Sequence, residues 1–249
     1  MLSILKNAGE GCITYYVGDN IEHISHLKDC KLICKKKFEG LNNVVQIVVN
    51  DPQLHFYKLS HKVRDTFIFS DGGYNIGNAC QIHKSVVIGL GVKIGDNVTI
   101  GPNSVIYSNT EIGDNVEIGA NCTIGTEGMM WVWDGDVKVF LKQLGGVKIG
   151  NNCILWSGNH IGHHSTIGDH VFITSHVVIS GCCNIKNNSF FGVNSTVRDE
   201  TIVEEYSLIG MGCILTKDTS PGDIWFGAKP FKKEIKSQNI DSISHKTNG

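Results

Sequence analysis

The sequence has little proline, no excess of either charge, and no hydrophobic run of membrane-spanning length. Four prolines stand against 29 glycines, and 22 basic against 24 acidic residues give a formal net charge of −2. Without a basic excess, nucleic-acid binding has no electrostatic support. No stretch approaches the roughly 18 apolar residues of a membrane span, and residues 1–11 lack the apolar stretch of a signal peptide. We therefore expect a soluble cytoplasmic protein.

Cysteine is present, but not in the pairs that mark a metal or redox motif. The chain has nine cysteines and no CxxC pair. An odd number of cysteines without a signal peptide indicates reduced thiols rather than disulfides. The sequence therefore predicts neither a disulfide framework nor a metal site.

An aliphatic residue recurs every six positions through most of the chain. One series runs from Ile76 to Ile124 and a second from Ile149 to Leu215, and only Phe191 is not aliphatic. A unit of six residues is too short for a helical repeat, whereas a short strand and a turn fit it. Stacked units of this kind bury the aliphatic residues in one continuous core.

The fifth position of the hexad carries a second small or medium-sized residue. Five of the nine cysteines take this place: Cys80, Cys122, Cys153, Cys183 and Cys213. A free cysteine packs like a small hydrophobic residue. We therefore interpret these five thiols as core packing rather than chemistry.

The hexads resemble those of the hexapeptide-repeat acyltransferases over about residues 76–230. The resemblance implies a mainly β fold, a left-handed parallel β-helix with three hexads in each triangular coil. The 21 hexads then make about seven coils. It also implies a homotrimer with active sites in the clefts between neighbouring β-helices. The left hand comes from the resemblance alone, because general rules favour right-handed crossovers.

The register breaks between Ile124 and Ile149, a spacing that is not a multiple of six. Residues 125–148 must therefore leave the coil as an inserted loop. The insertion carries Trp131 and Trp133, and apolar residues on such an excursion usually pack on something. Two interpretations stay open: packing against its own β-helix, or a lid over the cleft of a neighbouring subunit.

Residues before the repeat predict a small α/β domain. Residues 12–17 and 43–49 are rich in β-branched and aromatic residues and are expected to form strands. A helix follows, with Asp51 as N-cap and Pro52 at its first position. The expected organisation is a nucleotide-sugar-binding domain (1–70), a β-helix (71–230) and a C-terminal tail (231–249).

The N-terminal segments also resemble those of UDP-3-O-acylglucosamine N-acyltransferases. That family holds uracil between two aromatic side chains and an asparagine, and the first aromatic matches Tyr15. The asparagine position is Gly18 and the second aromatic is Ile21. These departures count against a uridine nucleotide, and a sugar linked to another nucleotide, such as a thymidine nucleotide, is compatible with them. The alternative is that Tyr15 only packs in its strand.

Five histidines lie between residues 160 and 176, but the register separates them. His164, His170 and His176 each occupy the fourth position of successive hexads, which belong to different faces of the triangle. The zinc enzymes of this fold pair two histidines five residues apart, and no two of these five have that spacing. We therefore predict no metal here.

The stretch IGHHSTIG matches the segment that carries the catalytic histidine of the resembled acyltransferases, and the match falls on His163. One coil is eighteen residues, so Gly181 stacks on His163. The resemblance implies His163 as general base, a role suited to a side chain that titrates near neutrality. It implies the N–H of Gly181 as the oxyanion donor.

Two residues depart from the family pattern around this pair. Many amino-sugar acetyltransferases follow the base with an acidic residue that orients it, and His164 stands there. Glu200 stands where the lipid A enzymes have a second histidine. We expect His164 and Glu200 to contact the substrate.

The C-terminal end resembles the acetyl-CoA-binding end of these enzymes. The family's small-Pro-Ala-Lys turn is permuted here to Gly227-Ala228-Lys229-Pro230. Gly227, Ala228 and Lys229 are therefore the expected cofactor-binding residues, with lysine as a point charge for CoA phosphates.

Taken together, the resemblance predicts transfer of an acyl group, acetyl in the first place, from acyl-CoA to the amino group of a nucleotide-linked amino sugar. Such sugars supply bacterial surface polysaccharide and O-antigen. Three other functions stay open: a lipid A-type transferase that uses acyl carrier protein, a zinc hydratase like a carbonic anhydrase, and a non-catalytic sugar-nucleotide binder.

Overall fold

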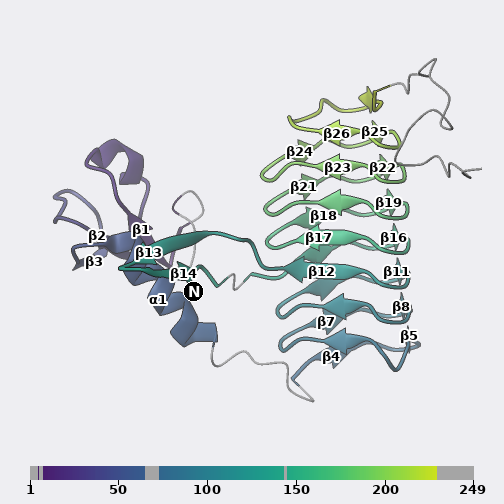
Figure 1. Ribbon diagram of the computed structural model, residues 1–249, viewed down its shortest axis with the longest axis horizontal. Coiled ribbons are helices and arrows are strands. Elements are labelled where there is room, and N and C mark those ends of the chain that lie inside the picture. The colour runs from purple at the N-terminus through teal and green to yellow at the C-terminus, as the bar shows by residue number, and fades with distance from the viewer. Residues whose placement is uncertain (1–4, 6–7, 65–72, 143–144, 229–249) are drawn as a thin grey trace, which may run out of the picture.

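The computed structural model describes residues 5, 8–64, 73–142 and 145–228 (Figure 1). It contains a long β-helix and a smaller N-terminal unit beside it. Lys229, the expected tail (231–249) and most of the segment that joins the two parts lie outside the described residues.

The β-helix consists of three parallel sheets of seven, eight and seven short strands, where the sequence predicts about seven coils. The first sheet contains β4 (Asn75–Ile76), β7 (Lys93–Ile94), β10 (Glu111–Ile112), β15 (Lys148–Ile149), β18 (Thr166–Ile167), β21 (Asn184–Ile185) and β24 (Ile202–Val203). The second contains β5 (Gln81–Ile82), β8 (Thr99–Ile100), β11 (Glu117–Ile118), β16 (Ile154–Leu155), β19 (Phe172–Ile173), β22 (Phe190–Phe191), β25 (Leu208–Ile209) and β27 (Ile224–Trp225). The third contains β6 (Val87–Ile88), β9 (Val105–Ile106), β12 (Thr123–Thr126), β17 (His160–Gly162), β20 (Val178–Ile179), β23 (Thr196–Val197) and β26 (Ile214–Leu215).

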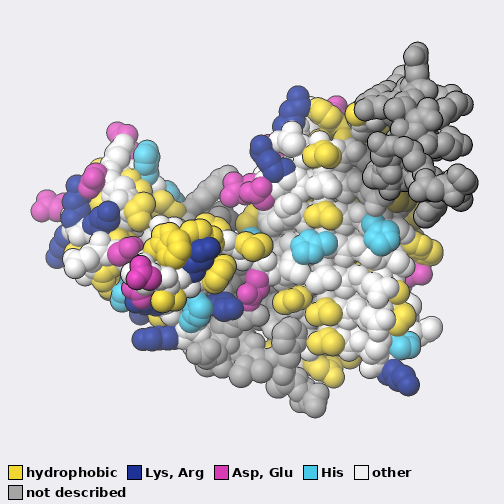
Figure 2. Space-filling model, viewed as in Figure 1, with side chains coloured by type: hydrophobic (Ala, Val, Ile, Leu, Met, Phe, Trp, Pro, Cys, Tyr) yellow, Lys and Arg dark blue, Asp and Glu magenta, His cyan; other side chains and the backbone are white. Residues whose placement is uncertain are grey.

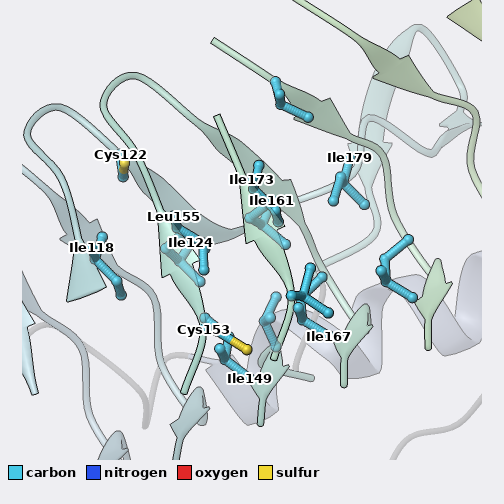
Figure 3. Close-up of a cluster of buried hydrophobic side chains, with 14 of the residues drawn as sticks. Ile118, Cys122, Ile124, Ile149, Cys153, Leu155, Ile161, Ile167, Ile173 and Ile179 are labelled. Atoms are coloured by element: carbon cyan, nitrogen blue, oxygen red, sulfur yellow. The ribbon is translucent and has the colours of Figure 1, made fainter. Parts of the chain in front are cut away.

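Successive coils place residues eighteen apart side by side. Ile76 pairs with Ile94, and Ile161 pairs with Ile179. The first residue of every hexad therefore points into a single continuous core, and from Ile94 onward each of them is buried. Figure 3 shows this ladder with two of the fifth-position thiols beside it. The expected packing role holds for the buried cysteines of the hexads, while Cys80 is half-buried at the open end of the core.

The fourth residue of the hexad makes the turn between faces, and it has a positive φ. Asn97, Asn115 and Asn152 have φ between 56° and 57° there. Asparagine and histidine enter this left-handed region more readily than other non-glycine residues. His170 and His176 adopt the same conformation with φ of 58°. Their place in the sequence therefore has a conformational reason that needs no chemistry.

The insertion leaves the coil after β12 and returns at β15. Across it, paired residues are 37 positions apart instead of eighteen, as in Glu111 with Lys148. The inserted chain forms an antiparallel hairpin of β13 (Trp131–Asp134) and β14 (Val137–Phe140). The predicted departure from the coil is confirmed.

The N-terminal unit has a parallel sheet of three strands in the order β1-β2-β3, covered by a helix. Its elements are β1 (Ile13–Tyr16), the short 3-10 helix η2 (Ile21–Ile24), β2 (Lys31–Cys34), β3 (Val45–Val48) and α1 (Pro52–Arg64). Asp51 caps α1, since its carboxylate accepts the N–H of Leu54 at 2.9 Å. Neither of the described helices is long and apolar enough to cross a membrane.

The hairpin packs on the N-terminal unit, which corrects the expectation that it packs on its own β-helix. Leu141, at the end of β14, is buried with Phe56 and Tyr57 of α1. The N–H of Lys142 donates to Ser60 Oγ at 3.0 Å. The opposite side, with Trp131 and Trp133, is exposed, and Figure 2 shows hydrophobic side chains beside basic ones on this unit. A lid over a neighbouring subunit stays a prediction.

Truncating one core side chain is expected to destabilise the β-helix strongly. Ile173 is fully buried, so Ile173→Ala should lower the free energy of unfolding by about 2–5 kcal/mol. Val178, on a neighbouring face, is 37% exposed, and Val178→Ala should cost about 1 kcal/mol or less. Denaturant unfolding of both variants measures the difference, and equal costs would contradict the buried ladder.

Weakening the hairpin contact is expected to loosen the insertion without unfolding the coils. Leu141→Ala removes a side chain that is 7% exposed and lies against α1. Amide hydrogen exchange should accelerate in β13 and β14 and stay slow in β16 to β23. Met129→Ala, which changes a side chain that is 85% exposed just before β13, is the control and should leave exchange in β14 unchanged. Exchange that does not respond to Leu141→Ala would mean that the hairpin is held elsewhere.

Candidate active site

The predicted base lies where the insertion leaves the coil. The pairing of β12 with β17 is irregular between Ile124 and Thr126. Beyond this bulge, the carbonyl of Thr126 accepts the N–H of His163 at 3.0 Å. Bulges of this kind re-aim side chains beside active sites. The site therefore sits at the root of the insertion, at the corner that follows β17.

His163 and Gly181 stack as the eighteen-residue register predicts. The carbonyl of His163 accepts the N–H of Cys182 at 2.8 Å, which fixes the two coils against each other. A Cβ on Gly181 would lie 2.5 Å from Cε1 and 2.6 Å from Nε2 of His163. The imidazole ring therefore lies directly over the Cα of Gly181, where only glycine leaves room for it.

The surroundings keep His163 neutral. Desolvation and, to a smaller extent, His164 lower the pKa of His163 to about 4, against an opposing contribution from the Asp199 carboxylate. The pKa of His164 is also lowered by desolvation. Both rings are therefore unprotonated at neutral pH, and each has one nitrogen with a free lone pair.

His164 contacts His163 directly. The two Nδ1 atoms are 3.0 Å apart, and the rings meet edge to face at a centroid distance of 5.2 Å. One Nδ1 donates and the other accepts. On its far edge, the His164 ring rests on Gly145, where a Cβ would collide with Cδ2 and Nε2 of the ring. His164 is therefore a direct neighbour of the predicted base.

The N–H of Gly181 differs from its equivalents on the neighbouring corner of the β-helix. There the third residue of a hexad donates its N–H to a side chain one coil further on, as Asn151 does to Asp169 at 2.6 Å and Asp169 to Asn187 at 2.9 Å. Within the described chain we find no such bond from Gly181 to Asp199. Such a backbone N–H can donate to an oxyanion, and the neutral imidazole beside it can accept a proton.

A thiol and two carboxylates complete this corner. Cys182 Sγ lies 4.0 Å from His163 Nδ1. Glu200 donates its N–H to the carbonyl of Gly181 at 2.9 Å, and its side chain is exposed. Burial, followed by the charges of Glu200 and Asp199, raises the pKa of the Cys182 thiol. The thiol is therefore protonated at neutral pH.

The other predicted site residues lie away from this corner. Gly227 and Ala228 follow β27 at the C-terminal end of the β-helix, and a Cβ on Gly227 would lie 2.6 Å from the carbonyl oxygen of Gly212. Lys229 lies outside the described residues. An acyl-CoA molecule that contacts both the His163 corner and this C-terminal end has to extend along several coils, which lie roughly 5 Å apart.

Tyr15 packs inside the N-terminal unit. Its ring lies 4.9 Å from that of Phe56 and 6.3 Å from that of Tyr57. Burial, with a contribution from Tyr57, raises the pKa of Tyr15 to about 12. This environment matches the packing alternative more closely than a free stacking platform.

The remaining histidines do not join His163. His160 Nε2 lies 2.9 Å from Thr126 Oγ1 on the same face, whereas His170 and His176 turn the chain at the other two corners. On the face of the β-helix drawn in Figure 2 the histidine side chains lie apart from one another. The prediction that the position-four histidines do not form one cluster is confirmed.

Three residues of the site are not identified in the sequence analysis. Thr126 and Gly145 lie at the two ends of the insertion, where the hexad register gives no guide. Cys182 has a clear signal, since it follows His164 by one coil of eighteen residues. Histidine spacings alone do not reveal Cys182.

Comparisons with known proteins agree with the repeat. Residues 73–106, 91–126 and 146–181 match the bacterial transferase hexapeptide (six repeats), and residues 185–217 match the hexapeptide repeat of succinyl-transferase. The solved UDP-N-acetylglucosamine acyltransferase of Arabidopsis superimposes with a TM-score of 0.53 over 91% of this chain and 69% of its own, at 17% identity. At that identity the superposition shows the fold, including its left-handed coil.

A sequence relative is the mitochondrial gamma carbonic anhydrase 1 of Arabidopsis thaliana. It is 29% identical over 86 residues, which are 33% of this chain. The match spans only 30% of that protein, so it is limited to a few coils. The repeat is matched along both halves of the β-helix, so the chain carries the hexapeptide repeat of bacterial transferases.

Proposed function

We propose that this protein is an acyltransferase that moves an acyl group, acetyl in the first place, from acyl-CoA to the amino group of a nucleotide-linked sugar. The observation that carries the proposal is the stacking of a neutral imidazole, His163, on the backbone of Gly181. A general base and a backbone N–H side by side are the two groups that acyl transfer to an amine needs.

His164 supports the role of His163 by setting its tautomer. When His163 Nδ1–H donates to His164 Nδ1 across 3.0 Å, the lone pair of His163 is left on Nε2. That nitrogen lies next to Gly181, so the base and the N–H donor face the same small space. Holding an imidazole in its productive tautomer is the usual task of the third group in such sites.

The proposed reaction balances without any further reactant. The sugar amine attacks the thioester carbonyl carbon, and the N–H of Gly181 stabilises the negative charge that forms on the carbonyl oxygen. His163 Nε2 takes the proton that the nitrogen loses. The C–S bond breaks, and the protonated His163 returns this proton to the departing CoA sulfur, so that CoA leaves as the thiol and the amide remains on the sugar.

The rest of the proposal follows the family resemblance. The acceptor would approach along the insertion, which leaves the coil beside His163 and carries the hairpin that packs on the N-terminal unit. Glu200, which is exposed two coils beyond His164, would contact the acceptor. Gly227 and Ala228, with Lys229, would meet the CoA end of the donor. A homotrimer and a cytoplasmic location belong to the same proposal.

The alternatives differ in what they require of this corner. A transferase that uses acyl carrier protein keeps the same base and N–H but needs a basic docking surface for an acidic partner. A hydratase like the carbonic anhydrases needs a bound zinc ion for turnover. A non-catalytic sugar-nucleotide binder needs neither His163 nor Gly181.

Loss of the base is expected to abolish most of the transfer. His163→Ala removes the proton acceptor and should lower kcat by about 10²–10⁴-fold. CoA thiol release from acetyl-CoA, over a panel of TDP-, UDP- and GDP-linked amino sugars, measures the rate and identifies the acceptor. His170→Ala, a turn histidine at another corner, is the matched control and should keep the native rate. Release that survives His163→Ala would show that the base is another residue.

A methyl group on Gly181 is expected to impair catalysis more than folding. Gly181 has no positive φ, so alanine fits the backbone, but its Cβ would displace the His163 ring. Gly181→Ala should lower kcat by about 10²-fold, because small misplacements of a catalytic group have effects of this size. Thermal unfolding and thiol release are measured together. Gly9→Ala, where a Cβ meets nothing within 4 Å, is the control, and full activity of Gly181→Ala would contradict the stacked geometry.

A further inference from the structure

His163, His164 and Cys182 bring three metal-ligating atoms together. Their donor atoms all lie within 4.8 Å of one another. The two Nδ1 atoms are 3.0 Å apart, and Cys182 Sγ is 4.0 Å from that of His163. Around a tetrahedral zinc ion, with bonds of about 2.0–2.3 Å, neighbouring ligand atoms are roughly 3.3–3.6 Å apart. The observed separations bracket this range.

The backbone holds the three side chains in this arrangement. His164 and Cys182 are the turn residues of consecutive coils, with φ of 57° and 59°. They therefore leave the corner in the same direction, one above the other. Gly145 lies beside the Cδ2 and Nε2 edge of His164, and Gly181 lies beside Cε1 and Nε2 of His163. The set is positioned by the fold rather than by chance contact of mobile side chains.

From this geometry we propose that His163, His164 and Cys182 bind a borderline-soft divalent transition-metal ion, with Zn²⁺ as the prime candidate. Two imidazoles and one thiolate form a three-ligand set that leaves a fourth position open to water. The site goes beyond the proposed transferase activity, and its test needs no substrate.

The nearby charges favour a cation. The carboxylates of Glu200 and Asp199 disfavour a thiolate on Cys182 when no ion is present. Once a dication binds, the same carboxylates stabilise the added positive charge. Binding releases the thiol proton to solvent, as metal binding to cysteine requires. The proton on His163 Nδ1 moves to Nε2, so that both Nδ1 lone pairs face the ion.

Metal binding and base catalysis exclude each other at this site. With the ion on Nδ1, the Nε2 of His163 carries a proton and cannot accept one from an amine. The metal site is therefore not a cofactor site of the proposed transfer. It would make the same corner sensitive to free transition-metal ions.

Cobalt is the probe that tests the site. The full chain, stripped of metal, is titrated with Co²⁺ alone, and thiolate-to-cobalt charge transfer is followed in the near ultraviolet. We expect one ion per chain with a charge-transfer band. Cys182→Ser should abolish the band and weaken Co²⁺ binding at least about tenfold, and His164→Ala should weaken it to a similar extent.

Two control variants test whether Co²⁺ binds elsewhere on the chain. Cys183→Ser changes the adjacent thiol, which points into the core, and His170→Ala changes a turn histidine at another corner. Both should bind Co²⁺ as the native chain does, with circular dichroism confirming the fold of every variant. Absence of Co²⁺ binding, or a band that persists in folded Cys182→Ser, would overturn the proposal.

Discussion

Burial of one aliphatic residue in every six is the constraint on which the rest of the structure depends. From Ile94 to Leu215 the first residue of each hexad is buried, and strands of successive coils pair residue for residue. Because a coil closes only when three hexads are complete, each side chain has its neighbour eighteen positions away. A shift of one residue would move the aliphatic side chains out of the core. The exposed positions are therefore placed as strictly as the buried ones.

The candidate site follows from this regularity and from its one interruption. Position three supplies His163 and Gly181, and position four supplies His164 and Cys182, so the reactive groups form a column along one edge of the triangle. The insertion leaves the coil at this edge, and its two ends contribute the Thr126 carbonyl and the Gly145 support of His164. The hairpin packs on the N-terminal unit, so the insertion links that unit to the coils that carry the site.

The sequence predicts the stacked residues of positions three and four well, but not the residues of the insertion around them. Because the coils repeat every eighteen residues, the period alone predicts that Gly181 stacks on His163. Thr126 and Gly145 are not predicted, because the pairing across the insertion depends on how many residues it contains. β2 is missed because its apolar stretch is only three residues long, between Lys31 and Lys35. The sequence does not predict that the hairpin packs on α1. Alternation of apolar and polar residues shows that one face of a strand is buried, but not which element covers that face.

A crystal structure of the protein with a non-hydrolysable acetyl-CoA analogue would test the central claim, that the column at the root of the insertion is the place of acyl transfer. The account predicts the carbonyl oxygen of the analogue within about 3 Å of the Gly181 nitrogen, with His163 Nε2 facing the space in front of the carbonyl carbon. A donor whose thioester lies at either of the other two corners, away from His163, would contradict it.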